Sequence, residues 1–564
     1  MNPAPETREA APQQGKAAPF TKSQEKFSNP NDRVQEKKGD AVKKVYADKL
    51  ETSTKWEIPE DVIPVPCGAI SYTKAAEIIF NAFASKNTLF IREDVVHEIK
   101  RGKIDTLQPV EPERFCSIVE KVGKRIARRE VDKDNKDIWR SARFPQNAAR
   151  IILATDESKT LLPNIYQLTN CPIITPDGSI LTKGYHTFNG GTYISTGEFV
   201  PEVSLDRAVQ ALVDLLRDFA FTTPADKSRA VASLISPAFK MGGHITDDFP
   251  LDFAEADKSQ SGKTYRQMLV TRLYNEAPAA IIQPKGGVGS LDESISKVLI
   301  QGRPFVVFDN IRGKIDSQIM ETAIRGVGKV NCRIPHMAPV EVNSKPFLWQ
   351  LSTNGAELTR DLANRSIITR IRKQPEDYRW HDYLEGDLLN HVVSRQAIYL
   401  GAIFAVVRAW LDAGSPRTKE CRHDFRDWVQ VMDWIVQNLF KMPPLLDGHR
   451  EEQARTANPR LQWLRDVAFA AADSQMTARE LSASELCAIA EDAGIELPGN
   501  PYSKEEPHQR AGKILGLLYR ENGGETISVD GFSVIRTETI IYDNGKRNHR
   551  FYTFLCPPVT PSHP

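Results

Sequence analysis

Between residues 250 and 372, apolar residues follow two alternating patterns. Short apolar runs between polar loops predict buried strands at 250–254, 279–283, 304–310, 346–354 and 366–371, with shorter ones near 330–334 and 339–343. Apolar positions three and four residues apart predict helices after Thr264 and at 292–301, 317–325 and 358–364. Buried strands that alternate with helices are typical of a parallel sheet, so we predict an α/β domain over 201–375.

The flanking regions show other patterns. Upstream, helical spacing at 75–84 and 110–126, a short strand at 88–91 and a hairpin turn at 176–178 predict a mixed α/β domain with a β junction over 56–200. Two further helices are expected at 205–219 and 227–241, the second ending at Gly242-Gly243. Downstream, apolar stripes at 388–411 and 425–440 predict a helical lid over 376–450.

The C-terminal region, 451–564, combines helical and extended patterns. Short helices are expected at 477–481, 482–493 and 508–519, followed by strands at 532–542 and 550–554. The turn between these strands carries the basic residues Lys546, Arg547 and Arg550. This order predicts a winged helix whose basic residues contact DNA phosphates, and the alternative use of such a module is protein contact.

Amino-acid composition predicts a tail at the N-terminus, and the net charge limits where nucleic acid can bind. Residues 1–55 contain few apolar residues, which predicts a disordered tail. The formal net charge is +1, so any nucleic-acid surface has to be local. One candidate is a basic face expected on a single helical segment near Trp139, and its alternative is a solvated charged face. Its residues are Lys121, Lys124, Arg125, Arg128 and Arg129.

The chain carries the features of a protein from a reducing compartment. Its seven cysteines form no CxxC pair, which argues against a disulfide framework or zinc site. The N-terminus lacks an apolar signal core, and the longest apolar stretch, 397–407, is too short to cross a bilayer. We therefore expect a cytoplasmic protein with no membrane partner.

Candidate chemistry is concentrated where the first central helix begins. Gly262-Lys263-Thr264 stands there, after a polar loop with Ser259, Gln260 and Ser261. Backbone N–H groups of such a loop, and of the first turn of a helix, bind phosphate oxygens. Lys263 can reach β- and γ-phosphates, and the Thr264 hydroxyl can bind Mg2+. The sequence thus predicts a P-loop NTPase core with ATP and Mg2+ as cofactors.

Polar residues end two later strands of the same predicted sheet. Asp309 and Asn310 follow one apolar run, and Asn354 ends another. Ligands bind at the carboxyl ends of parallel strands, so we expect these residues on the same edge as Lys263. Asp309 suits a hold on Mg2+, and Asn354 suits contact with the γ-phosphate or the attacking water.

In this order the motifs resemble those of AAA+-like, superfamily-three-type ATPases, which phages, plasmids and integrative elements carry as replicative helicases or helicase–primase subunits. Gly262-Lys263-Thr264 matches Walker A, Asp309-Asn310 matches an Asp-Asn form of Walker B, and 352–355 is similar to the sensor segment. The stretch 172–185 resembles the segment before that ATPase, with His186 replacing an Asp. Residues 361–365 resemble a motif that normally ends in two arginines.

The resemblance implies that Arg365 is an arginine finger for the γ-phosphate of a neighbouring subunit, and hence a homo-oligomer such as a hexameric ring. It also implies single-stranded or forked DNA as the partner. Asp257 replaces the first Walker A glycine, and Asn364 replaces the first arginine of the usual pair. Asn310 stands where many AAA+ proteins have a catalytic glutamate, so the base is Glu293 or Glu255, or Asn310 positions the water.

The leading hypothesis is an ATP-hydrolysing DNA motor, a helicase-like replication ATPase of a mobile genetic element. The alternative is an ATP-dependent DNA-binding regulatory or loader protein without unwinding activity, which Asp257 and the missing glutamate favour. A third hypothesis is a nonenzymatic interaction protein with a decayed P-loop.

Overall fold

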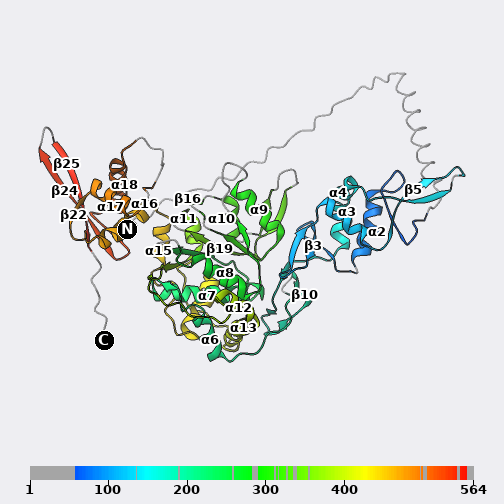
Figure 1. Ribbon diagram of the computed structural model, residues 1–564, viewed down its shortest axis with the longest axis horizontal. Helices are drawn as coiled ribbons and strands as arrows, with labels where there is room; N and C mark the ends of the chain where they lie inside the picture. Colours follow the sequence, from blue (N-terminus) through cyan, green and yellow to red (C-terminus); the bar gives the residue numbers. More distant parts are fainter. Residues whose placement is uncertain are drawn as a thin grey trace, which may run out of the picture.

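The computed structural model describes residues 57–84, 86–134, 136–188, 191–256, 260–281, 290–309, 311, 313–315, 317–325, 328–333, 339–353, 356–495, 497–498, 505–542 and 546–555. The predicted tail, 1–55, lies outside them. Buried apolar residues form three large clusters, which fall within 63–162, 171–446 and 463–554. In Figure 1 the first part (blue) and the last part (orange to red) lie at opposite ends of the molecule, with the central part between them.

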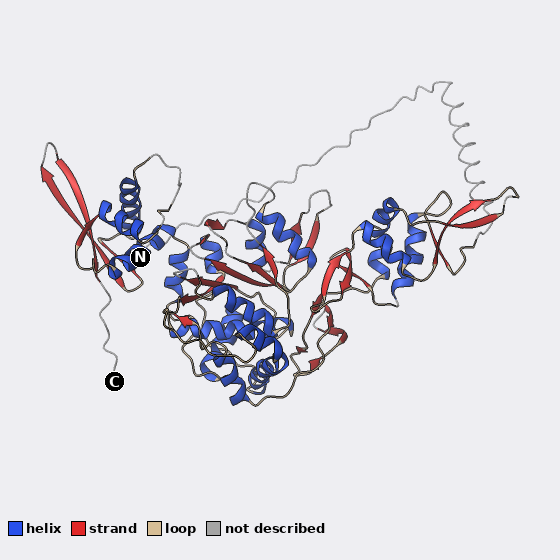
Figure 2. Ribbon diagram, in the orientation of Figure 1, coloured by secondary structure: helices blue, strands red, loops and turns tan. Residues whose placement is uncertain are grey.

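The central part is built on a six-stranded sheet, as Figure 2 shows in red. Its strands, in spatial order, are β12 (Ala220–Phe221), β21 (Ser366–Arg372), β13 (Leu251–Ala256), β19 (Leu348–Thr353), β15 (Phe305–Phe308) and β14 (Ala279–Ile281). All neighbours pair in parallel except β12 and β21. The expected mixed α/β fold with a parallel sheet is therefore confirmed.

The apolar sequences of the central strands match their burial. All four residues of β15 and all six of β19 are buried, as expected for a parallel strand covered on both faces. Two small sheets flank the main one. They are formed by β16 (Gly313–Ile315) with β20 (Ala356–Leu358), and by β17 (Lys329–Cys332) with β18 (Val340–Asn343).

Helices surround the central sheet at the predicted places. They are α6 (Leu205–Asp214), α7 (Pro224–Met241), α8 (Lys263–Leu273), α9 (Leu291–Gln301), α10 (Gln318–Ile324), α11 (Arg360–Asn364), α12 (Leu388–Ser394), α13 (Gln396–Asp412) and α14 (Arg426–Asn438). Local signals set several ends. Thr223 and Asp226 form a capping box at the start of α7, and left-handed Gly302 ends α9. The helices of the predicted lid, α12 to α14, share the apolar core of the sheet.

Among the described residues, no single helix is long and apolar enough to cross a membrane. Helices α12 and α13 pass that test only as a pair, with a bend of 82° between them. Nine residues of α13, from Leu400 to Trp410, are buried inside the protein.

The N-terminal part mixes small sheets and helices. Its elements are β1 (Val62–Pro64), α2 (Tyr72–Ala84), β2 (Leu89–Arg92), β3 (Val95–Lys100), β4 (Thr106–Pro109), α3 (Pro112–Glu120), β5 (Arg125–Val131), β6 (Asp137–Ser141), α4 (Gln146–Leu153) and α5 (Asp156–Leu161). A β junction follows, with β7 (Gln167–Thr169), β8 (Ile173–Ile174), β9 (Ile180–Leu181), β10 (Gly184–Phe188) and β11 (Gly191–Ser195). The predicted turn at 176–178 joins β8 to β9, where the Gly178 N–H donates to the Thr175 carbonyl at 2.9 Å.

The prediction of one helix over 110–126 was wrong. Helix α3 ends at Glu120, and Gly123 has a φ of +86°, which a continuing helix does not allow. Residues from Arg125 onward form β5, which pairs with β1 in parallel and with β6 antiparallel. Arg125, Arg128 and Arg129 therefore lie on a strand, and the expected basic helical face does not exist.

The C-terminal part contains four helices: the last three pack against a four-stranded sheet, whereas the first packs on β21 of the central sheet. The helices are α15 (His449–Thr456), α16 (Pro459–Asp473), α17 (Ala483–Asp492) and α18 (Pro507–Glu521). The strand order is β22-β25-β24-β23, formed by β22 (Glu480–Ser482), β25 (Lys546–Leu555), β24 (Phe532–Tyr542) and β23 (Thr526–Val529). Strands β24 and β25 form a long ribbon that projects from the end of the molecule (Figure 1).

The predicted helix at 477–481 is also wrong. Ala478 has a φ of +59°, and its N–H donates to the Phe554 carbonyl at 2.8 Å. Leu481 then pairs with Tyr552 in the sheet, and Ser482 caps α17 through a capping box with Glu485. Good helix formers are thus held extended because they complete the sheet on one side and begin a helix on the other.

Candidate nucleotide site

The loop that ends at Gly262 joins the central strand β13 to helix α8. Gln260 and Gly262 have φ values of +61° and +92°, so the chain turns sharply into the helix. A Cβ on Gly262 would lie 3.2 Å from the ring of Phe219, so glycine suits both the conformation and the space. Helix α8 begins at Lys263, whose side chain is buried, with Nζ 3.4 Å from the Ser261 hydroxyl.

Three polar side chains meet at the carboxyl ends of the strands. The Thr264 hydroxyl donates to the Asp309 carboxylate at 2.9 Å, and the Ser352 hydroxyl donates to the same oxygen at 3.0 Å. The two hydroxyl oxygens are 3.1 Å apart. Thr264 lies in the first turn of α8, Ser352 lies near the end of β19, and Asp309 follows β15. Two distant segments therefore converge on one carboxylate oxygen of a third.

The loops on either side of this contact are also tied together. The Thr353 hydroxyl donates to the Ile311 carbonyl at 2.8 Å, which joins the end of β19 to the chain just after Asp309. The predicted residues Asn310, Asn354, Ser259 and Asp257 lie outside the described residues.

Buried polar contacts fix α8 against the sheet. Arg266 lies fully buried between Asp252 of β13, at 2.5 Å, and Ser233 of α7, at 2.9 Å. Gln267 donates to the carbonyls of Asp252 and Leu351 at 3.1 and 2.8 Å. The start of the helix, with Lys263 and Thr264, is therefore held in one position relative to β13 and β19.

The two glutamates proposed as bases occupy different places. Glu255 is only 6% exposed and lies on β13, directly opposite Thr353 on one side and Arg370 on the other. Glu293 lies in the first turn of α9, where its backbone N–H donates to the Ser290 hydroxyl at 3.1 Å. Glu255 is thus on the strand that enters the Gly262 loop.

Arg365 makes its contacts within its own chain. Its guanidinium donates to the Glu321 carbonyl at 2.8 Å and pairs with Asp361 at 2.7 Å. The residue directly follows helix α11 and is 9% exposed, whereas Arg360 at the start of that helix is exposed. A role in a neighbouring subunit would require Arg365 to leave these contacts.

The predicted DNA-binding residues lie on strand β25. Lys546 and Arg547 pair with Tyr542 and Ile541 of β24 through the backbone, and their side chains lie outside the described part. Arg550 is exposed, and its Nε donates to Glu538 of the facing strand at 2.9 Å.

Sequence reasoning missed Ser352 and Arg370. The polar end of the run 346–354 pointed toward Asn354, yet Ser352 is the residue that contacts Asp309. Arg370 lies inside an apolar strand, where only the pairing of β21 with β13 brings it opposite Glu255.

No family model and no curated protein matches the chain. Among solved structures, the apo C-terminal region of NrS-1 matches at 10% identity and a TM-score of 0.36, covering 84% of this chain and 98% of that chain. SCCmec type IV Cch, described as an active helicase, matches at 9% identity and 0.27, with coverages of 82% and 97%. JCV helicase matches at 11% identity and 0.20, with coverages of 45% and 72%. These scores are too low to support an argument about function.

Proposed function

We propose that this chain binds and hydrolyses ATP as a helicase-like DNA motor in the replication of a mobile genetic element. The observation that carries the proposal is the contact of Thr264 with Asp309, made beside Lys263 at the carboxyl edge of a parallel sheet. A lysine, a hydroxyl and a carboxylate at a helix start are the groups that a Mg2+–triphosphate requires.

In this proposal each residue acts on a stated part of the substrate. The backbone N–H groups of Gln260 to Thr264 hold the phosphate oxygens, and the Lys263 ammonium binds the β- and γ-phosphates. Thr264 and Asp309 offer hard oxygen atoms, which Mg2+ prefers, so the two side chains fit the ion. Bound Mg2+ would neutralise charge on the β- and γ-phosphates. Ser352 keeps the Asp309 carboxylate oriented toward Thr264.

Other residues would act on the γ-phosphate, the attacking water and the DNA. Asn354 contacts the γ-phosphate, and Asn310, Glu255 or Glu293 positions or activates the water. Arg365 acts on the ATP of a neighbouring subunit in a homo-oligomer, after leaving Asp361. The C-terminal part is a winged helix, and Lys546, Arg547 and Arg550 contact DNA phosphates without reading sequence.

One observation favours the second candidate, an ATP-dependent DNA-binding regulatory or loader protein without unwinding activity. Arg365 is bonded to Asp361 and to the Glu321 carbonyl of its own chain, which leaves the transition-state charge of a neighbouring ATP without its arginine. Hydrolysis would then be slow.

The deciding experiment measures ATP turnover with and without single-stranded DNA. Lys263→Ala should lower the turnover by about a hundredfold or more, because it removes a cation from the phosphates. Lys297→Ala, at an exposed position of α9, is the matched control and should keep the parent rate. Equal turnover in the Lys263→Ala variant and the parent would reject the site, and a fork-unwinding assay separates the motor from the loader.

A further inference from the structure

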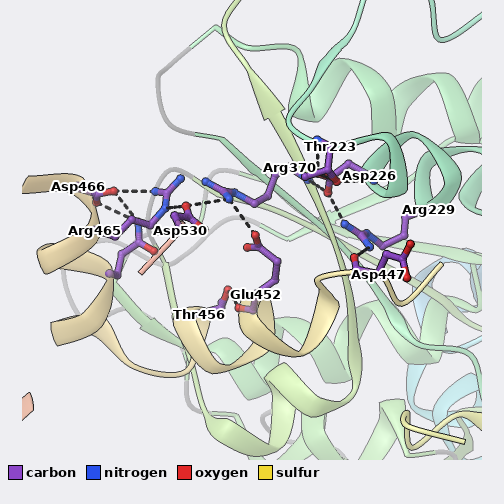
Figure 3. Close-up of polar contacts among 11 residues, drawn as sticks. Thr223, Asp226, Arg229, Arg370, Asp447, Glu452, Thr456, Arg465, Asp466 and Asp530 are labelled. Carbon is purple, nitrogen blue, oxygen red and sulfur yellow. Dashed lines mark hydrogen bonds and ion pairs between the residues drawn. The ribbon is translucent and has the colours of Figure 1, made fainter. Parts of the chain in front are cut away.

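Two arginines and one aspartate join the C-terminal part to the central sheet (Figure 3). Asp530, in the turn between β23 and β24, accepts from Arg465 Nε of α16 at 2.5 Å. The same carboxylate oxygen lies 3.1 Å from the guanidinium of Arg370 on β21. Asp530 thus bridges a helix of its own part and a strand of the sheet.

This bridge is buried and continues into the connecting helix. The side chains of Arg370, Arg465 and Asp530 are 8%, 6% and 18% exposed. Arg370 also pairs with Glu452 of α15 at 2.9 Å, and Arg465 pairs with Asp466 at 2.8 Å. Buried charges of this kind are expensive to leave without a partner, so these residues should move together or exchange partners together.

The bridge also reaches the strand that enters the Gly262 loop. Arg370 stands directly opposite Glu255 in the pairing of β21 with β13, and paired residues of a sheet point to the same face. Burial lowers the pKa of Arg465, but the carboxylates of Glu255, Asp530 and Asp466 outweigh it and raise the pKa on balance. Both arginines are therefore within electrostatic reach of Glu255.

A long paired strand begins next to the same aspartate and runs to the basic end of the ribbon. Strand β24 starts at Phe532, two residues after Asp530, and continues for 11 residues to Tyr542. It is paired with β25 from Ser533–Leu555 to Tyr542–Lys546. At about 3.3 Å per residue the strand is about 36 Å long and links the turn that holds Asp530 to the proposed DNA contacts.

The cluster around Asp530 contains more negative than positive side chains. Four carboxylates, on Glu255, Glu452, Asp466 and Asp530, surround two guanidiniums, on Arg370 and Arg465. A triphosphate at the Gly262 loop would add negative charge near Glu255 and compete with Asp530 for the arginines, since such attractions are strong where water is excluded.

We propose that Asp530 couples the two ligands: nucleotide at the Gly262 loop changes the DNA affinity of the ribbon by altering the hold of Arg370 and Arg465 on Asp530. Asp530 is a positioning residue, which touches neither ligand. The coupling rests on the proposed binding of ATP and DNA. By linkage, DNA on the ribbon changes the affinity for nucleotide by the same factor.

The test variant is Asp530→Asn in the full-length chain. Asp530 has a φ of +47°, and asparagine tolerates this left-handed backbone, so the variant removes the charge and keeps the turn. The matched control is Glu521→Gln, because Glu521 pairs with Arg460 at 2.6 Å inside the C-terminal part and does not bridge to the sheet.

The measurement is the Kd of a fluorescein-labelled oligothymidylate with and without a nonhydrolysable ATP analogue and Mg2+. Adding the analogue should change the Kd for the oligothymidylate by about fivefold or more in the parent and in Glu521→Gln. In Asp530→Asn the same addition should change this Kd by less than about twofold. In each protein, adding DNA should change the Kd of the analogue by the same factor by which the analogue changes the Kd of the DNA. If Asp530→Asn melts below the assay temperature, Arg465→Lys, which loses the Nε donor, is used with the same criteria.

The outcomes separate the two proposals. A parent that binds no nucleotide overturns the proposed function. A parent that binds both ligands with unchanged affinities, or an Asp530→Asn variant that keeps the parent's ratio, overturns the coupling alone. If Glu521→Gln also loses the difference between the DNA Kd values with and without the analogue, the loss comes from general loosening of the C-terminal part. That result would also reject the role of Asp530.

Discussion

His97 shows at the scale of one residue how the N-terminal part depends on protonation. Its ring is fully buried between two carbonyls, with Nδ1 2.8 Å from the Val95 oxygen and Nε2 3.0 Å from the Ile300 oxygen. Burial, and then the charge of Arg92, lower its pKa to about 4. The neutral ring has one N–H, so only one of these contacts is a hydrogen bond at neutral pH.

This pKa predicts acid sensitivity. The folded value of about 4 lies below the ordinary 6.5, so the stabilisation is complete above pH 6.5 and is lost as pH falls toward 4. The free energy of unfolding should fall by about 3 kcal/mol over that range. Urea unfolding followed at several pH values measures it. His97→Gln should flatten the dependence, and His508→Gln, at an exposed position, should not. Parallel curves for His97→Gln and the parent would contradict the assignment.

At the scale of elements, the central sheet was predictable and two helices were not. Buried runs such as β15 and β19 are apolar along their whole length because both faces are covered, and the sequence displays this directly. The errors at 110–126 and 477–481 have another cause. Gly123 and Ala478 adopt left-handed conformations, and the segments beside them pair with the distant strands β1 and β25, which local periodicity does not record.

Strands β5 and β6 bring two arginines face to face. Arg128 and Arg140 stand directly opposite each other in the pairing of β5 with β6, and Arg140 pairs with Glu130 at 2.9 Å. Like charges in this position destabilise a sheet, so Arg128→Thr should raise the free energy of unfolding by about 0.2–1 kcal/mol.

The control for this change is Arg129→Thr on the same strand. Arg129 pairs with Asp137 at 2.5 Å, so its loss should lower stability or leave it unchanged. Thermal unfolding of both variants beside the parent gives the comparison. Stability of Arg128→Thr that is equal to or lower than that of the parent would show that the facing arginines do not repel each other.

Across the whole molecule, the residues that meet at the site were easier to predict from the sequence than the residues that orient them. The rule that ligands bind at the carboxyl ends of parallel strands places Thr264 near Asp309, and they are 2.9 Å apart although 45 positions separate them. Ser352, Arg370 and Asp530 could not be found in this way, because their contacts arise only when β19, β21 and the C-terminal part are packed together.

An arginine that acts on the ATP of a neighbouring subunit allows two inactive variants to complement each other. If Arg365 acts on the ATP of a neighbour, Arg365→Ala should abolish turnover alone but recover part of it when mixed with Lys263→Ala protein, because some interfaces then combine an intact site with an intact arginine. ATP turnover against mixing ratio measures the recovery. Arg360→Ala, at the exposed start of the helix that Arg365 follows, should be active unmixed. No recovery at any ratio would assign Arg365 a structural role.

The strand order of the central sheet has a consequence for synthesis on the ribosome. Strand β13 lies between β19 and β21, which begin at Leu348 and Ser366, so both its neighbours are made long after it. Until then the nascent chain carries an apolar strand with two open edges, the kind of segment that pairs with other chains. We expect truncated chains that end before β19 to aggregate or to bind chaperones, and release to come only once β21 has left the exit tunnel.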